Sequence, residues 1–314
     1  MENKCLYCYD PLNNEVDFHK KCSSQFFGIQ EPPVLPYSMR QMYELAKNIV
    51  ERSIAVPGVQ AKLSISLIKR TQKESEGRLT VVGALGGNYI FKPPSDKFPE
   101  MPANEHLTMR IAEAYNIQVV PSSLIRLASG ELSYITKRID RLGSGEKVHL
   151  LDMFQITEAF DKYKSSMEKV GKVLHLYSEN TLLDKIIYFE LSLFCFLVGN
   201  NDMHLKNFSM IKNTNGWMLA PAYDLLNVSI ILPDDKEELA LTLEGKKKKL
   251  KNENFVHLGK SLDLTDKQIE SVFKRMVKNK AKAIEWIDKS FLSDRMKIAY
   301  KEVLESRYLQ LGLA

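Results

Sequence analysis

The residues best suited to chemistry lie in the polar segment 198–209, which follows an apolar run. Within it, Asp202 and Asn207 are separated by four residues, the spacing between the catalytic aspartate and the metal-binding asparagine of a phosphoryl-transfer loop. A second carboxylate, Asp224, follows a predicted hairpin downstream. Because Mg²⁺ prefers carboxylate and amide oxygens, the pattern predicts Asn207 and Asp224 as magnesium ligands and Asp202 as the catalytic residue.

The same residue types also cap helices and turns, and the D-x-x-x-x-N pattern alone often occurs by chance. Two upstream residues favour the chemical interpretation. Lys92 ends a predicted strand just before two prolines, and this strand position is that of the lysine that grips nucleotide phosphates in kinases. Glu105 on the next predicted helix can pair with Lys92, as the helix glutamate does in kinases. Taken singly, Lys92 is typical of a solvated strand end, and Glu105 of a first-turn residue favoured by the helix dipole.

A third candidate is the turn-like segment from Pro57 to Lys62, which leads into a predicted strand. Gly58 would let backbone N–H groups approach a phosphate closely. One glycine is equally typical of a plain turn.

The elements that must position these residues follow a simple order. Strand patterns dominate the first half of the chain around one prominent helix, and helical patterns dominate from residue 150 onward. We expect helices over 38–51, 104–115, 151–160, 181–198, 266–278 and 293–309, and strands over 63–68, 89–92, 118–127, 132–137, 208–212 and 216–219. This order predicts an α+β chain in two lobes, with no alternation typical of a parallel sheet.

Taken together, these segments resemble the HipA family of bacterial serine/threonine kinases, the toxins of type II toxin–antitoxin systems. The resemblance covers most of the chain from about residue 40 and implies a protein-kinase-like two-lobe fold with a strand-rich N-lobe and a helical C-lobe. The matching segments are 53–62, Asn104-Glu105, 137–141, 202–207 and 222–226.

The resemblance assigns roles residue by residue. It implies that Asp202 is catalytic, that Asn207 and Asp224 bind magnesium, that Glu105 partners Lys92, and that Lys137 to Ile139 form the hinge whose backbone reads the adenine. The implied ATP-binding set is Pro57, Gly58, Val59, Gln60, Ala61, Lys62, Lys92, Lys137, Arg138, Ile139, His204, Lys206 and Asn207.

The family also carries a regulatory serine that is autophosphorylated, and Ser53 is the matching residue. The chain departs from the family here, because Val56-Pro57 is inserted between Ser53 and the glycine of the phosphate loop. The assignment of Ser53 therefore rests on fewer matching positions than that of Asp202.

A second departure concerns length, because full-length HipA proteins begin with an extra subdomain. The chain is most similar to the short HipT form, for which the resemblance implies a HipS-like small subdomain protein and a HipB-like DNA-binding antitoxin as partners. The implied substrate is a serine of a protein target, an aminoacyl-tRNA synthetase. The expected organisation is an N-terminal hook or zinc-knuckle-like segment over 1–36, an N-lobe over 37–138 and a C-lobe over 139–314.

Four soft or borderline ligands stand at the N-terminus: Cys5, Cys8, His19 and Cys22. Their types suit tetrahedral Zn²⁺, and the alternative is a metal-free hook with packed cysteines. Cys195 lies in an apolar run and is expected in the core. The lysine run 246–249 is expected to be a solvated turn, with RNA or acidic-partner binding as the alternative.

Composition sets broad limits on the function. The chain has 314 residues, 44% hydrophobic and 26% charged, and these shares exclude the disordered, collagen-like and disulfide-scaffold classes. Its net charge of +5 excludes little by itself. The absence of a secretory signal and of an 18-residue apolar span predicts a cytoplasmic protein. No helix-turn-helix pattern stands out, so DNA binding is expected only through a partner. Two alternatives to a protein kinase stay open: a small-molecule kinase of the same fold, and a basic RNA-binding module with a degenerate kinase lobe.

Overall fold

The computed structural model describes residues 3–13, 16–52, 62–69, 77–81, 87–142 and 146–313. The chain divides into two compact units. Unit 1 comprises Met1–His106, Val120–Arg141 and Lys289–Phe291, and unit 2 comprises Leu107–Val119, Leu142–Asp288 and Leu292–Ala314.

Unit 1 is built on a five-stranded antiparallel sheet with the strand order β2-β1-β3-β5-β4. Its strands are β1 (Leu63–Lys69), β2 (Gly77–Val81), β3 (Tyr89–Lys92), β4 (Ser122–Arg126) and β5 (Leu132–Lys137), preceded by helices α1 (Lys20–Phe27) and α2 (Met39–Arg52). The alternating burial of Leu63 and Ile65 matches the period of two in the sequence. Central strand β3 pairs with β1 on one side and with β5 on the other, and Lys92 at its end lies opposite Tyr134 of β5.

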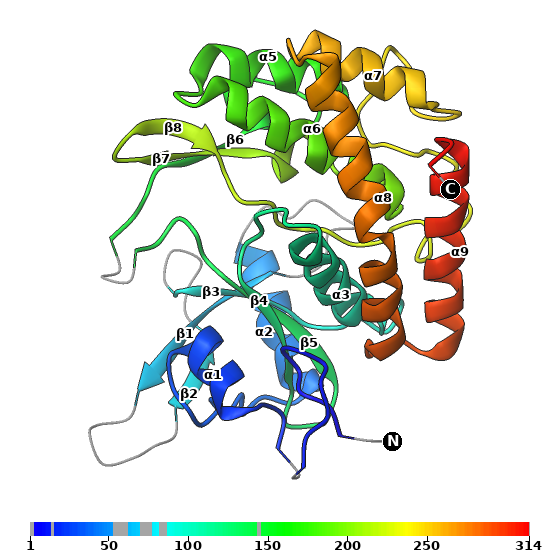
Figure 1. The fold of residues 1–314 in the computed structure, drawn as a ribbon. Helices are drawn as coiled ribbons and strands as arrows, with labels where there is room; N and C mark the ends of the chain where they lie inside the picture. Colours follow the sequence, from blue (N-terminus) through cyan, green and yellow to red (C-terminus); the bar gives the residue numbers. More distant parts are fainter. Residues whose placement is uncertain are drawn as a thin grey trace. The chain divides into compact units, whose positions relative to one another are not determined.

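Unit 2 is mainly helical, with a small antiparallel sheet in the order β6-β7-β8. Its elements are β6 (Leu150–Asp152), α4 (Met153–Ile156), α5 (Met167–Tyr177), α6 (Thr181–Leu197), the 3₁₀ turn η1 (Leu205–Asn207), β7 (Ser209–Asn213), β8 (Gly216–Leu219), α7 (Asn252–Ser261), α8 (Asp266–Lys289) and α9 (Asp294–Gln310). Helix α3 (Met101–Ala114) contributes its last residues to this unit. Helices α5, α6 and α7 gather on one side of the β7–β8 hairpin (Figure 1).

Helix α6 is the central element of unit 2. Its last seven residues, from Leu191 to Leu197, are all buried, which explains why the sequence there is almost continuously apolar. Cys195 lies in this core, as expected, with 1% of its surface exposed. No helix among the described residues is both long and apolar enough to cross a membrane.

Several predicted elements are confirmed within a few residues, including β3, β5, α6, α9 and the β7–β8 hairpin. The helix expected over 266–278 begins at the predicted residue, but α8 continues to Lys289. The helix expected over 151–160 is wrong. Leu150–Asp152 instead pairs with β7, and Asp152 then caps the four-residue helix α4 through a capping box with Gln155. The strand expected from residue 118 begins only at Ser122, after Pro121, which has no N–H for a ladder. Helices α1, α5 and α7 and strand β2 were not predicted.

Candidate active site

The loop after α6 is folded tightly around the predicted catalytic aspartate. The backbone N–H of His204 donates to the carbonyl of Asp202 (2.8 Å), and the side-chain Nδ2 of Asn207 donates to the same carbonyl (2.9 Å). Because its nitrogen is used in this bond, the amide of Asn207 has a fixed orientation, with Oδ1 as its remaining acceptor. The loop therefore couples the position of Asn207 directly to that of Asp202.

The carboxylate of Asp202 has a partner that the sequence did not reveal. Tyr163 Oη donates to Asp202 Oδ1 at 2.8 Å, across 39 positions of the chain. Burial and then the nearby charge of Asp202 raise the pKa of Tyr163, so the phenol stays protonated and remains a donor. No motif surrounds Tyr163, so only the folded structure identifies it.

His204 is buried beside this pair. Lys162 Nζ lies 2.9 Å from His204 Nε2, and the Tyr163 ring meets the imidazole edge to face at 5.1 Å. Burial and then Lys162 lower the pKa of His204, while the carboxylates of Asp202 and Asp224 oppose the shift. The imidazole is therefore neutral and accepts from Lys162 at Nε2, which leaves the proton on Nδ1. That nitrogen is buried and has no hydrogen-bond partner within the described part of the chain.

This shift predicts a pH dependence of stability. The folded state holds the pKa of His204 below its ordinary value of about 6.5. As the pH falls below that value, the unfolded chain takes up a proton that the folded chain does not, so this group makes stability fall toward acid. We expect His204→Gln to reduce the loss of unfolding free energy between pH 7.5 and pH 5.5, measured by urea denaturation. The control is His149→Gln, which makes the same change at an exposed histidine. If the pH dependence of stability in His204→Gln equalled that of wild type, the lowered pKa of His204 would be contradicted.

Asp224 is held next to the loop by its neighbour in sequence. Tyr223 Oη donates to the carbonyl of Lys206 (2.9 Å) and accepts from Ser209 Oγ (2.5 Å). Asp224 itself adopts a left-handed backbone conformation (φ 60°), which is uncommon for a residue with a side chain. Its carboxylate acts on the pKa of His204, as that of Asp202 does. The structure thus brings Asp202, His204, Asn207 and Asp224 together in unit 2.

Asn207 and Asp224, the predicted magnesium ligands, carry oxygens of the chemical type that Mg²⁺ prefers. Both are hard ligands, and the fixed amide of Asn207 has Oδ1 as its available acceptor. Lys206, in contrast, is exposed and lies over the ring of Phe154 at 4.7 Å.

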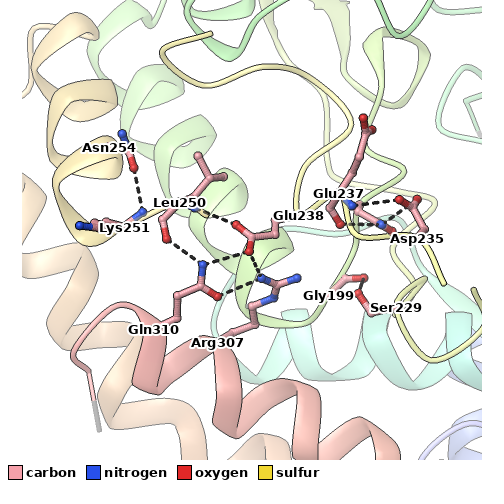
Figure 2. A network of polar contacts seen from close by, with 11 residues as sticks. Gly199, Ser229, Asp235, Glu237, Glu238, Leu250, Lys251, Asn254, Arg307 and Gln310 are labelled. Atoms are coloured by element: carbon pink, nitrogen blue, oxygen red, sulfur yellow. Dashed lines mark hydrogen bonds and ion pairs between the residues drawn. The ribbon is translucent and has the colours of Figure 1, made fainter. Parts of the chain in front are cut away.

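A polar network supports the start of this loop (Figure 2). Ser229 Oγ donates to the carbonyl of Gly199 (3.2 Å), and Asn201 Nδ2 donates to Asp235 (3.1 Å) and to the Glu237 carbonyl (2.9 Å). The next residue, Glu238, is tied to α9 by Arg307 at 2.8 Å. The segment that supports Asn201 is therefore itself anchored to a helix.

The predicted phosphate-gripping pair forms in unit 1. Lys92 Nζ lies 2.5 Å from Glu105 Oε1, and the two side chains are only 5% and 2% exposed. The Lys92 ammonium also lies 5.3 Å from the ring centre of Tyr134. The predicted pairing of strand lysine with helix glutamate is therefore present in the structure as a buried contact.

The predicted hinge follows strand β5 in the same unit. The backbone N–H of Lys137 donates to Pro121 and that of Arg138 to Asn88. The guanidinium of Arg138 makes two bonds to Asp140, of 2.9 and 2.7 Å, and Ile139 between them is half-buried. These contacts fix the backbone before Ile139 and join the side chains of its two neighbours.

Ser53 and the segment from Pro57 to Ala61 lie outside the described residues. Lys62, the last residue of the predicted phosphate loop, is exposed and directly precedes β1.

The four N-terminal metal-ligand candidates come together in unit 1. Their ligand atoms all lie within 4.8 Å of one another: Cys5, Cys8, His19 and Cys22. The hydrogen bond from the Cys8 thiol lowers the pKa of Cys5, and the same contact raises that of Cys8.

Comparison with known proteins adds the family. Residues 54–284 match the model of the HipA-like C-terminal domain. A Haemophilus influenzae protein named "Putative kinase" is 31% identical over 211 residues, which cover 63% of this chain and 59% of the relative. "Putative kinase Y4dM" of Sinorhizobium fredii is 30% identical over 250 residues, covering 74% and 59%. The chain thus spans 59% of the length of each of these relatives.

Two solved structures confirm the kinase-like α+β fold. HipA of Shewanella oneidensis, solved in complex with HipB and operator DNA, superposes with a TM-score of 0.67 at 19% identity, over 82% of this chain and 65% of that one. The kinase CtkA of Helicobacter pylori gives a TM-score of 0.53 at 14% identity, over 72% and 88%.

Proposed function

Since the chain belongs to the HipA-like C-terminal domain family, we propose that it is an ATP- and magnesium-dependent serine/threonine protein kinase of a toxin–antitoxin system. The observation that carries the proposal is the double use of Asp202: its carbonyl orients the amide of Asn207, and its carboxylate is oriented by Tyr163. A loop with only capping roles would not require a phenol directed at the aspartate side chain.

Each residue then has a defined task. Tyr163 holds Oδ1 of Asp202, so Oδ2 is the oxygen left to accept the hydrogen bond of a substrate hydroxyl. The hydroxyl oxygen bonds to the γ-phosphorus, the bond from that phosphorus to the β-bridging oxygen breaks, and the hydroxyl proton passes to Asp202 or to the phosphate. A magnesium ion held by Asn207 and Asp224 would neutralise charge on the phosphates of ATP. Catalysis would come mainly from positioning, because an ordinary carboxylate is a weak base.

The proposed substrate and partners are those that the resemblance to the HipA family implies. The substrate would be a serine of an aminoacyl-tRNA synthetase, and Ser53 would be autophosphorylated. A HipB-like DNA-binding antitoxin is proposed because the Shewanella relative was solved with HipB and operator DNA. A HipS-like partner stays a prediction.

The test is transfer of the γ-phosphate of labelled ATP in a bacterial lysate, with Mg²⁺ present, followed by mass-spectrometric mapping of phosphosites. We expect label on a serine of a synthetase and on Ser53 of the chain itself, and no label when Mg²⁺ is chelated. Label on small molecules alone would favour the alternative that the chain is a small-molecule kinase. The absence of any ATP turnover would contradict both the protein-kinase and the small-molecule-kinase hypotheses.

A further inference from the structure

The N-terminal cluster of Cys5, Cys8, His19 and Cys22 has the arrangement of a metal site. Cys5 and Cys8 lie in one short turn, in which the N–H of Tyr9 donates to the Cys5 carbonyl (2.9 Å). His19 directly precedes helix α1, and Cys22 lies in its first turn. Two short segments thus supply two ligands each, which is the usual plan of a structural zinc site.

The distances between the ligand atoms agree with tetrahedral coordination. With Zn–S near 2.3 Å and Zn–N near 2.0–2.1 Å, a tetrahedron separates sulfur from nitrogen by about 3.6 Å. His19 Nδ1 lies 3.4 Å from Cys8 Sγ and 3.8 Å from Cys22 Sγ, and all four ligand atoms lie within 4.8 Å of one another. Only small movements would bring all four to one ion.

The orientation of His19 supplies an independent argument. Its Nε2 lies 3.1 Å from the carbonyl of Pro11, which can only accept, so the ring proton is on Nε2. The lone pair is therefore on Nδ1, the atom that faces the thiols. Metal-bound histidines almost always donate their second nitrogen to such an acceptor, which fixes the tautomer.

We propose that Cys5, Cys8, Cys22 and Nδ1 of His19 bind one Zn²⁺ ion in a structural site. The three thiols lose their protons on binding, so the site carries a net charge of −1. All four positions are filled by the protein, as in structural rather than catalytic sites. Cys5 is completely buried, which excludes a role as an exposed nucleophile.

The ion would fasten the N-terminal segment to the sheet of unit 1. The Leu6 carbonyl, between the first two ligands, accepts from the N–H of Leu124 in β4 (3.2 Å). On the same segment, Tyr9 Oη is 2.8 Å from His106 Nδ1. The ring of Phe26 in α1 packs near the ring of Tyr89 in β3, and Lys137 Nζ lies 5.5 Å from the centre of the Phe26 ring. Helix α1 has only eight residues, and a helix of this length is not stable without tertiary contacts or a bound ion to hold it.

The experiment measures metal in the full chain after purification and dialysis, by inductively coupled plasma mass spectrometry. We expect about one zinc ion per chain, and less than about a tenth of that in Cys8→Ser. Cys195→Ser removes a thiol outside the cluster and is expected to keep the zinc. The proposal would be overturned if wild-type protein refolded in the presence of zinc contained none. It would also be overturned if Cys8→Ser protein contained as much zinc as wild type.

Two further measurements guard against a variant that simply misfolds. Co²⁺ added to wild-type protein stripped of zinc should produce the visible absorption of a tetrahedral thiolate complex, and its absence would refute the site. Zinc chelation should lower the melting temperature of wild type by about 10 °C, and zinc should restore it. An unchanged melting temperature would refute the structural role. None of these readouts needs phosphoryl transfer, so the zinc site and the kinase proposal can fail separately.

Discussion

Replacing Asp202 by asparagine is expected to reduce phosphoryl transfer from ATP by about 10³-fold, within the range of 10²–10⁴ for a lost proton acceptor. Asparagine has the same shape, and its Oδ1 can still accept from Tyr163, so the loop should keep its fold. The variant loses the negative charge and the second acceptor oxygen that would orient the substrate hydroxyl. The measurement is the initial rate of label transfer at saturating ATP.

The matched control is Asp234→Asn, which makes the same chemical change at an exposed loop residue of the same unit. We expect its transfer rate to equal that of wild type. The melting temperatures of both variants should stay close to that of wild type, so that a loss of rate cannot be ascribed to unfolding. If Asp202→Asn transferred phosphate at the wild-type rate, Asp202 would not be the catalytic residue.

The candidate functional residues that could be predicted from sequence, in either unit, are those with short-range contacts. Asp202 and Asn207 lie five positions apart, and their hydrogen bond closes within the loop itself. Lys92 and Glu105 are thirteen positions apart, at the facing ends of two well-patterned elements. Tyr163 and Lys162, by contrast, reach the loop from 39 and 42 positions away, through a segment without periodic pattern. One sequence carries no signal for such contacts.

Two of the three helices that were not predicted, α5 and α7, share a physical reason. Helix α5 contains Gly171, and a Cβ there would lie 2.3 Å from Leu262 Cδ2. Helix α7 contains Gly259, where a Cβ would lie 2.6 Å from Ile269. Glycine lowers helix propensity by about 1 kcal/mol, so close packing hides both helices from propensity arguments. Helix α1 is short and begins directly after His19 of the proposed metal site.

The ion pair of Lys92 and Glu105 is expected to show the second large effect. Lys92→Met should lower the free energy of unfolding by about 3–5 kcal/mol, because it leaves the Glu105 carboxylate buried without its lysine. The matched control is Lys280→Met, which breaks the pair with Glu305, whose side chain is 48% exposed. Exposed pairs contribute at most about 1 kcal/mol, so this variant should change stability little. Urea unfolding of the full chain measures both.

A double variant separates the two roles of Lys92. Replacing both partners, as Lys92→Met with Glu105→Leu, removes both buried charges with side chains of similar volume, and such replacements are often neutral for stability. We therefore expect the double variant to recover most of the stability lost in Lys92→Met. Its KM for ATP should nevertheless remain raised, because no ammonium is left to bind a phosphate. Recovery of stability without recovery of ATP affinity would assign Lys92 to the nucleotide. Recovery of both would mean that the pair only supports the fold, and the predicted phosphate contact would be wrong.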